Sequence, residues 1–284
     1  MRGSSGRSKR IRLPSRAALS WLRRALPLVL LAVLGCGGSA PRIETLPSSD
    51  AELAPGREAF ERGDYTRAVE KLTAFLDAHP GSSQLDQVLF LLGRAHQNLG
   101  ENLLAAERYD RLIRDFPQSP LREEAEYRLA ESYLDESLGP AYDPESTENA
   151  LSLLRAYLVR YPNGSFADLV RAGIDQATEK LARKAYLNAI TYQRLDKPRG
   201  AILYLNKALE MKPDFGRAGD ALAMLARNEE RLGEWPEARK AWERLLEYAT
   251  PERIARDSDL RGLKAEAEQR LRSLAARNAS GGTP

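Results

Sequence analysis

A proline recurs at the end of four similar apolar segments, and this recurrence constrains the fold more than any other feature of the sequence. The segments FLDAHP, LIRDFP, YLVRYP and ALEMKP end at Pro80, Pro117, Pro162 and Pro213. Proline cannot continue a helix, because it lacks the backbone N–H and its ring clashes with the preceding turn. We therefore expect four helices, each of which ends just before one of these prolines.

Small residues lie at fixed distances before the same prolines. Alanine stands twelve residues earlier in all four segments, and glycine stands seventeen residues before the first two prolines. A small side chain lets two helices approach closely, and glycine readily takes the left-handed conformation that ends a helix. Small residues also stand twenty-four residues before three of the prolines. These three sets are Ala68, Ala105, Ala150 and Ala201; Gly63 and Gly100; and Gly56, Gly93 and Ala189.

These offsets match the small-residue and proline positions of the tetratricopeptide (TPR) repeat, a helix-turn-helix unit. A fifth unit, RLGEWPEARKAWERLL, repeats the core with Gly233, Ala238 and Trp242 and closes near Pro251. Apolar residues recur with helical spacing over residues 88–99, as one face of an amphipathic helix requires. The sequence predicts an all-α fold, a right-handed superhelical solenoid of about five TPR repeats with a C-terminal capping helix. A generic helical bundle is the alternative.

The third repeat is longer than its neighbours. Ala130 lies 32 residues before Pro162, whereas Gly93 lies 24 residues before Pro117, so eight residues are inserted within 137–147. This stretch, SLGPAYDPEST, holds two prolines and a glycine, a composition that predicts a loop.

The segments around the insertion carry further expectations. Ser146 or Thr147 is expected to cap the helix that follows the loop. Residues 165–194 are expected to form one long helix or two joined helices. A final amphipathic helix near 258–276 is expected to cap the solenoid.

The first 35 residues have the composition of an export signal. Eight of the 43 basic residues lie in this segment, which holds no acidic residue. The apolar run 25–34, ALPLVLLAVL, is ten residues long. A spanning helix needs about 20, so we interpret the run as the core of a signal peptide. The rest of the chain holds more acidic than basic residues, which argues against nucleic-acid binding.

Cys36 is the single cysteine of the chain and follows the apolar run in the segment VLGC. This segment resembles the lipobox of bacterial lipoproteins, which implies cleavage before Cys36 and diacylation of its thiol. Gly37 stands where aspartate would resemble an inner-membrane retention signal. The resemblance therefore implies a lipid anchor at the periplasmic face of the outer membrane of a Gram-negative bacterium. A buried or free cysteine after an ordinary signal peptide is the alternative.

The predicted domain boundaries follow from these features. The signal peptide covers 1–35, and the lipidated N-terminus with a flexible tether covers 36–52. TPR repeats one to three cover 53–164, and repeats four and five with the capping helix cover 165–277. A disordered tail covers 278–284.

Three segments resemble one family: FPQSPLREEAEYRLAESYL, AYDPESTENAL and LARKAYLNAITYQR. With the lipobox, the repeat count and the insertion, they resemble the BamD (also called YfiO or ComL) lipoproteins over about residues 53–249. The resemblance implies an outer-membrane-anchored scaffold subunit of the β-barrel assembly machine. The implied partners are unfolded outer membrane proteins, the last POTRA domain of the BamA-like barrel-forming subunit, and accessory lipoproteins.

The sequence contains no pattern typical of catalysis. The two histidines, His79 and His96, have no cysteine, aspartate or second histidine at metal-ligand spacing. A glycine-rich phosphate loop and a serine nucleophile elbow are both missing. We expect His79 on the surface at a helix end and His96 at a packed position. The sequence thus predicts a protein-binding scaffold without enzyme activity, cofactor or metal.

In TPR arrays the first helix of each repeat lines a groove, and the groove-facing positions of repeats one to three combine arginines with aromatic residues. Such a surface could accept an extended peptide that ends in an aromatic residue and a carboxylate. The family resemblance implies that these repeats receive the C-terminal targeting signals of unfolded barrel proteins. The alternative is that Phe60 and Phe90 are core between repeats. This N-terminal set is Arg57, Phe60, Phe90, Arg94, Gln97, Glu124 and Tyr127.

The equivalent positions of the last two repeats form a C-terminal set that is rich in arginine. Clustered arginines suit an acidic protein partner, and the family resemblance implies that this end binds the POTRA domain. Ordinary surface charge is the alternative, because Glu229 and Glu230 are neighbours of the arginines. The set is Tyr186, Gln193, Arg194, Arg227, Glu230 and Arg231, of which Tyr186, Arg194, Arg227 and Arg231 are the partner-binding candidates.

Two other functions remain as alternatives. The first is a TPR lipoprotein adaptor for cell division with the Tol-Pal system, or for assembly of a type IV pilus secretin. Such adaptors usually have regular repeats without the insertion. The second is a cell-wall hydrolase with a TPR module, which would need a separate catalytic domain.

Overall fold

The structure, a computed structural model, describes residues 49–279. The signal peptide 1–35, Cys36, Gly37 and residues 280–284 lie outside the described residues, so lipidation and the disordered end of the tail stay predictions. Within the described range the chain forms twelve α-helices and no strand. They are α2 (Ser49–Glu61), α3 (Tyr65–Ala78), α4 (Leu85–Asn98), α5 (Asn102–Asp115), α6 (Arg122–Glu136), α7 (Glu145–Arg160), α8 (Ala167–Arg194), α9 (Pro198–Met211), α10 (Ala218–Leu232), α11 (Trp235–Tyr248), α12 (Pro251–Arg256) and α13 (Asp259–Ala279).

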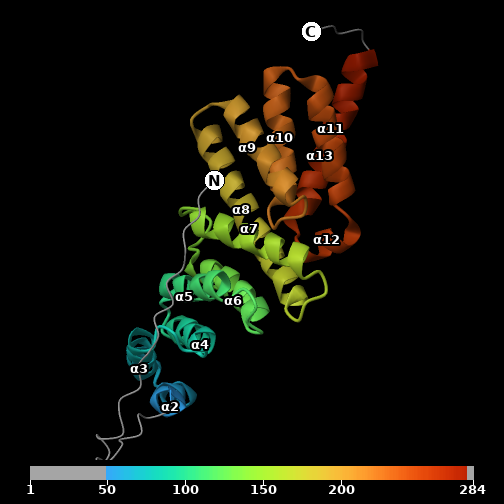
Figure 1. Ribbon diagram of the computed structural model, residues 1–284. Coiled ribbons are helices and arrows are strands. Elements are labelled where there is room, and N and C mark those ends of the chain that lie inside the picture. Colours follow the sequence, from blue (N-terminus) through green and yellow to red (C-terminus); the bar gives the residue numbers. More distant parts are fainter. Residues whose placement is uncertain (1–48, 280–284) are drawn as a thin grey trace, which may run out of the picture. The chain divides into compact units, whose positions relative to one another are not determined.

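From α2 to α11, each helix packs against the next, as can be followed in Figure 1. The result is five pairs: α2 with α3, α4 with α5, α6 with α7, α8 with α9, and α10 with α11. The last long helix, α13, packs on α11 and α10 and so covers the end of the fifth pair. This arrangement confirms the predicted all-α fold of five TPR repeats followed by a capping helix.

The second helix of each of the first four repeats ends two residues before its proline, as predicted. These helices are α3, α5, α7 and α9, which end at Ala78, Asp115, Arg160 and Met211. In the fifth repeat the role of the proline differs. Pro251 is the first residue of the short helix α12, where its missing N–H leaves no hydrogen bond unmade.

The turns inside the repeats use the left-handed conformation. Gly63, Gly100 and Gly233 have φ angles of 76°, 75° and 78°. In the fourth repeat Asp196 takes the same position with a φ of 58°, and aspartate is among the few other residues that tolerate it.

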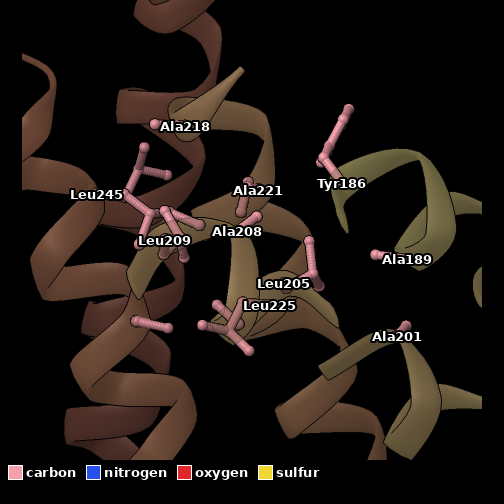
Figure 2. Packing of buried hydrophobic residues seen from close by; sticks show 14 of the residues in the cluster. Tyr186, Ala189, Ala201, Leu205, Ala208, Leu209, Ala218, Ala221, Leu225 and Leu245 are labelled. Atoms are coloured by element: carbon pink, nitrogen blue, oxygen red, sulfur yellow. The ribbon is translucent and has the colours of Figure 1, made fainter. Parts of the chain in front are cut away.

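Alanine occupies a buried position on the second helix of every repeat. Ala68, Ala105, Ala150, Ala201 and Ala238 are each fully buried, with 0% exposure. In the C-terminal repeats, leucines of α9, α10 and α11 pack among the buried alanines (Figure 2). The labelled leucines there are Leu205, Leu209, Leu225 and Leu245. A second large cluster joins α2 to α6. Alanines and larger apolar side chains thus share the core between the helices.

The eight-residue insertion is the loop 137–144, between the end of α6 and the start of α7. Lys180 donates to the carbonyl oxygen of Ser137 over 2.9 Å, and Lys184 donates to that of Ala141 over 3.0 Å. Both lysines belong to α8, so the loop is attached to the fourth repeat.

The expected cap of α7 was wrong. The helix already begins at Glu145, so Ser146 and Thr147 lie in its first turn. Thr147 is 2% exposed and faces the core. The side chain of Asp143 instead accepts a hydrogen bond from the Glu145 N–H, over 2.9 Å.

Two helix boundaries refine the predictions. Residues 165–194 hold one continuous helix, the 28-residue α8. The helix α2 begins at Ser49, within the range predicted as tether. Its first turn is held in place because Asp50 accepts from Gln84 and Glu52 contacts His79. None of the helices within residues 49–279 has the length and apolar composition needed to cross a membrane.

Candidate functional site

Three residues of the N-terminal set, Arg57, Phe60 and Arg94, are found where α2 lies beside α4. The guanidinium of Arg94 lies over the ring of Phe60, with its central carbon 5.3 Å from the ring centroid. Phe60 is half-buried and meets Tyr65 edge-on, with 5.5 Å between centroids. The neighbouring Arg57 donates to Gln87 over 2.6 Å. The structure thus brings Arg94 and Phe60 together from two repeats, and Arg57 stands about one helical turn before Phe60 on α2.

Phe90 takes a different place from Phe60. It is 7% exposed and packs edge-on against Tyr109, with 5.8 Å between ring centroids. Its contacts belong to the core cluster of the first repeats. The structure therefore supports, for Phe90, the alternative that this ring belongs to the core between repeats.

Gln97 and Tyr127 meet through a residue that the sequence analysis did not select. The hydroxyl of Tyr127 donates to Glu131 over 2.6 Å, and the Gln97 amide lies 3.3 Å from the other Glu131 oxygen. Arg128 binds the same carboxylate over 2.8 Å and also contacts Glu124, over 3.2 Å. Glu131 lies one helical turn after Tyr127, so helical spacing could have identified it.

The aromatic hydroxyls of this region stay protonated. Burial, the hydrogen bond to Glu131 and the charge of that carboxylate raise the pKa of Tyr127 above its usual range. The ring of Tyr127 is stacked on Phe166 with 4.9 Å between centroids. Tyr127 therefore acts as a fixed hydrogen-bond donor at the joint between the third repeat and α8.

The arginines in and around the N-terminal set differ in how their charge is balanced. Arg128 is neutralised by Glu131 and Glu124. Among the described residues, by contrast, no carboxylate lies within ion-pair distance of Arg57 or Arg94. A guanidinium group stacked on an apolar ring, with a second arginine one turn earlier on the same helix as that ring, can bind a carboxylate that is attached to an apolar side chain.

The C-terminal set does not form one cluster. Arg227 binds Glu266 of α13 through both carboxylate oxygens, with 2.8 Å from its Nε to Oε1. Arg231 pairs with Asp196 over 2.5 Å. Tyr186 is 7% exposed and packs against Phe215, with 5.9 Å between centroids. Of the three arginines in the set, only Arg194, which is exposed, has no ion pair among the described residues.

The two histidines serve the packing of the repeats. His96 is 5% exposed, and its Nδ1 lies 2.7 Å from a carboxylate oxygen of Glu101. This contact joins the end of α4 to the start of α5. His79 caps α3 and lies against Phe75. In the part of the chain that the structure describes, no group of three or more His, Cys, Asp or Glu side chains could hold a metal ion.

A hollow of about 600 Å³ lies between α5, α6 and α7, away from both predicted sets. Its apolar wall includes Leu103, Leu129 and Leu153, and its acidic residues are Glu107 and Asp110. Both acids already contact arginines of α5, so the hollow carries no unbalanced charge that would select a partner.

The sequence of the chain is similar to those of known proteins. The sequence model of the YfiO family, described as an outer membrane lipoprotein, matches residues 49–245. The chain is 27% identical over 205 residues to the outer membrane protein assembly factor BamD of Caulobacter vibrioides, covering 71% of this chain and 67% of that protein. It is 24% identical over 223 residues to the assembly factor BamD of Pasteurella multocida, covering 73% and 83%.

Solved structures also resemble the chain. A TPR repeat protein of Bacteroides fragilis aligns with a TM-score of 0.43 at 14% identity, covering 79% of this chain and 99% of that one. A thermophilic TPR protein of Thermus thermophilus aligns with a TM-score of 0.34 at 20% identity, covering 78% and 100%.

Proposed function

Because this chain belongs to the YfiO family of outer membrane lipoproteins, we propose that it is an outer membrane protein assembly factor. In this proposal Cys36 carries the lipid that holds the protein at the periplasmic face of the outer membrane. The repeats act as a scaffold, without enzyme activity, and bind client proteins and a partner subunit.

The client site is the N-terminal set, centred on Arg94 and Phe60. An unfolded barrel protein that ends in an aromatic residue would place its ring against Phe60 and its carboxylate near Arg94 and Arg57. The observation that carries this assignment is the stacking of Arg94 on Phe60, with no carboxylate of residues 49–279 in ion-pair distance of Arg57 or Arg94. Charge-assisted hydrogen bonds to guanidinium groups are about twice as strong as neutral ones.

The partner site is assigned to the C-terminal repeats, which would bind the POTRA domain of a BamA-like barrel subunit. Arg227 and Arg231 are held by Glu266 and Asp196, so they shape this surface rather than offer free charge. Arg194 and the exposed part of α8 remain available.

A peptide-binding measurement tests the client site. Full-length protein in detergent is titrated with a labelled peptide that ends in phenylalanine with a free carboxylate. The double variant Arg57→Glu, Arg94→Glu should bind at least about tenfold more weakly, since two attractive contacts become repulsive. The matched control is Arg67→Glu, Arg155→Glu, which reverses two exposed arginines elsewhere. If both double variants bind the peptide equally well and their circular dichroism is unchanged, the assignment of the client site is wrong.

A co-purification tests the wider proposal and separates it from the alternatives. The protein, solubilised with mild detergent, should bring down a POTRA-bearing barrel protein. Recovery of only Tol-Pal, cell-wall or pilus secretin components would favour the adaptor function instead.

A further inference from the structure

One face of α8 carries a stripe of residues at the spacing that helices use to pack on other helices. Arg183, Leu187, Ile190 and Arg194 follow one another at intervals of four, three and four residues. These positions fall on one side of a helix and extend over about 16 Å. We call them the α8 stripe.

The α8 stripe is accessible. Leu187 is 38% exposed, both arginines are exposed, and Ile190 is half-buried. A hollow of about 330 Å³ lies beside its apolar centre. Its walls are Arg183, Leu187 and Ile190 of the stripe, with Pro140, Tyr186 and Arg217.

The insertion of the third repeat builds one wall of this hollow. Pro140 belongs to the loop 137–144, and Lys184 binds the carbonyl of Ala141 in that loop. The loop is thereby attached to the helix that carries the stripe. The hollow is therefore partly built by the insertion of the third repeat.

The charge of the stripe is unbalanced. Arg183 and Arg194 have no ion pair with any residue in the described range, whereas Arg217 across the hollow pairs with Asp220 over 3.1 Å. Two free guanidinium groups thus flank two aliphatic side chains. The complementary surface has carboxylates at its ends and apolar side chains at its centre.

We propose that the α8 stripe is a docking site for an amphipathic helix of a partner protein. The apolar side chains of that helix pack on Leu187 and Ile190 and enter the hollow, and its carboxylates pair with Arg183 and Arg194. The α8 stripes of two copies of this chain would not pair with each other, because arginine would lie against arginine. The stripe includes Arg194 and lies on the exposed part of α8, so this inference rests on the partner site of the proposed function and specifies what binds there. It does not depend on the client site.

A designed helical peptide provides the test. It carries two glutamates eleven residues apart, the span from Arg183 to Arg194, with two leucines between them at the spacing of the stripe. Its binding to the full-length protein in detergent is followed by fluorescence anisotropy. A second peptide has lysine in place of both glutamates and is otherwise the same.

The glutamate peptide should bind the unchanged protein at least about tenfold more tightly than the variant Arg183→Glu, Arg194→Glu. The lysine peptide should show the opposite preference. The control variant Arg155→Glu, Arg199→Glu reverses two other exposed arginines and should bind the glutamate peptide normally.

Failure of the glutamate peptide to bind, or equal binding to the unchanged and reversed proteins, overturns the proposal. These outcomes leave co-purification with a barrel protein unaffected, so they are distinguishable from failure of the proposed function.

Discussion

The guanidinium of Arg94 on α4 lies over the ring of Phe60 on α2, 5.3 Å from its centroid. This contact joins the first helices of two successive repeats. It fixes the direction of a positively charged group that no carboxylate of the described residues neutralises. The same contact therefore contributes to packing and, in the proposed function, holds the Arg94 guanidinium in position to bind a client.

A double-mutant cycle should detect this contact in the absence of any client. Phe60→Leu and Arg94→Gln should couple by about 0.5–1 kcal/mol in the free energy of unfolding, the usual range for cation–π pairs near a surface. Urea denaturation of the four proteins gives the coupling. Phe60→Leu paired with the exposed Arg67→Gln should be additive. A coupling of zero for Phe60 and Arg94 would show that the stacking contributes nothing to stability.

A substitution at Gly93 should test how closely α4 and α5 pack in the second repeat. A Cβ at this position would lie 2.5 Å from Cε1 of Tyr109, whose ring is fully buried. Gly93→Ala should therefore destabilise the protein by about 1–3 kcal/mol through overpacking, although alanine favours helix.

Gly262→Ala is the matched control, because a Cβ there meets nothing within 4 Å and the residue lies in α13. It should be neutral or stabilise by up to about 1 kcal/mol. If both alanine variants unfold at the same urea concentration, the close contact with Tyr109 is not a constraint.

The positions of Gly93 and of the prolines show which parts of the fold the sequence could predict. Proline, left-handed glycine and small core residues act locally or on the adjacent helix, so their spacing predicts where helices end and where they cross. The aromatic residues are harder to place. Phe60 and Phe90 both lie on first helices of repeats, yet Phe90 contacts Tyr109 inside the core and Phe60 stays half-buried.

Long-range charge pairs account for most of the unpredicted part of the candidate sites. Arg227 is held by Glu266, thirty-nine residues later, in the capping helix rather than in a repeat. Nothing in the repeat pattern indicates that partner. Free and neutralised arginines look alike in a sequence, and the difference between Arg194 and Arg227 depends on how α13 packs.

The buried Glu229 should make stability fall as the pH rises. Burial, together with Glu237 and Glu234, raises the pKa of this carboxyl from 4.5 to about 7. Its Oε2 has no hydrogen-bond partner among the described residues. The folded state then holds a proton that the unfolded chain releases, so stability is fully present below about pH 4.5 and declines toward pH 7.

Glu229→Gln should remove this decline and stabilise the protein at pH 8 by about 1–2 kcal/mol. Urea denaturation from pH 5 to pH 8 measures this effect as the difference in the free energy of unfolding between the variant and the unchanged protein. Glu247→Gln, which changes an exposed carboxylate of α11, should give no such difference. A constant difference between Glu229→Gln and the unchanged protein across this range contradicts the raised pKa.

Release of the insertion loop should expose it to protease without unfolding the repeats. Lys180 donates to both the carbonyl and the hydroxyl of Ser137, over 2.9 and 2.5 Å. Lys180→Met keeps the apolar part of the side chain and removes both bonds, so the loop should open more often. Leu138 and Tyr142 in the loop are already 62% and 61% exposed, and chymotrypsin cleaves after such residues.

Cleavage within 137–144 should therefore be several-fold faster in Lys180→Met, as mass spectrometry of the fragments can show. Lys207→Met, which alters an exposed lysine of α9, is the control and should be cleaved at the unchanged rate. Equal rates for the two variants would mean that the loop is held by other contacts. Because Pro140 lines the hollow beside the α8 stripe, faster cleavage should be accompanied by weaker binding of the glutamate peptide.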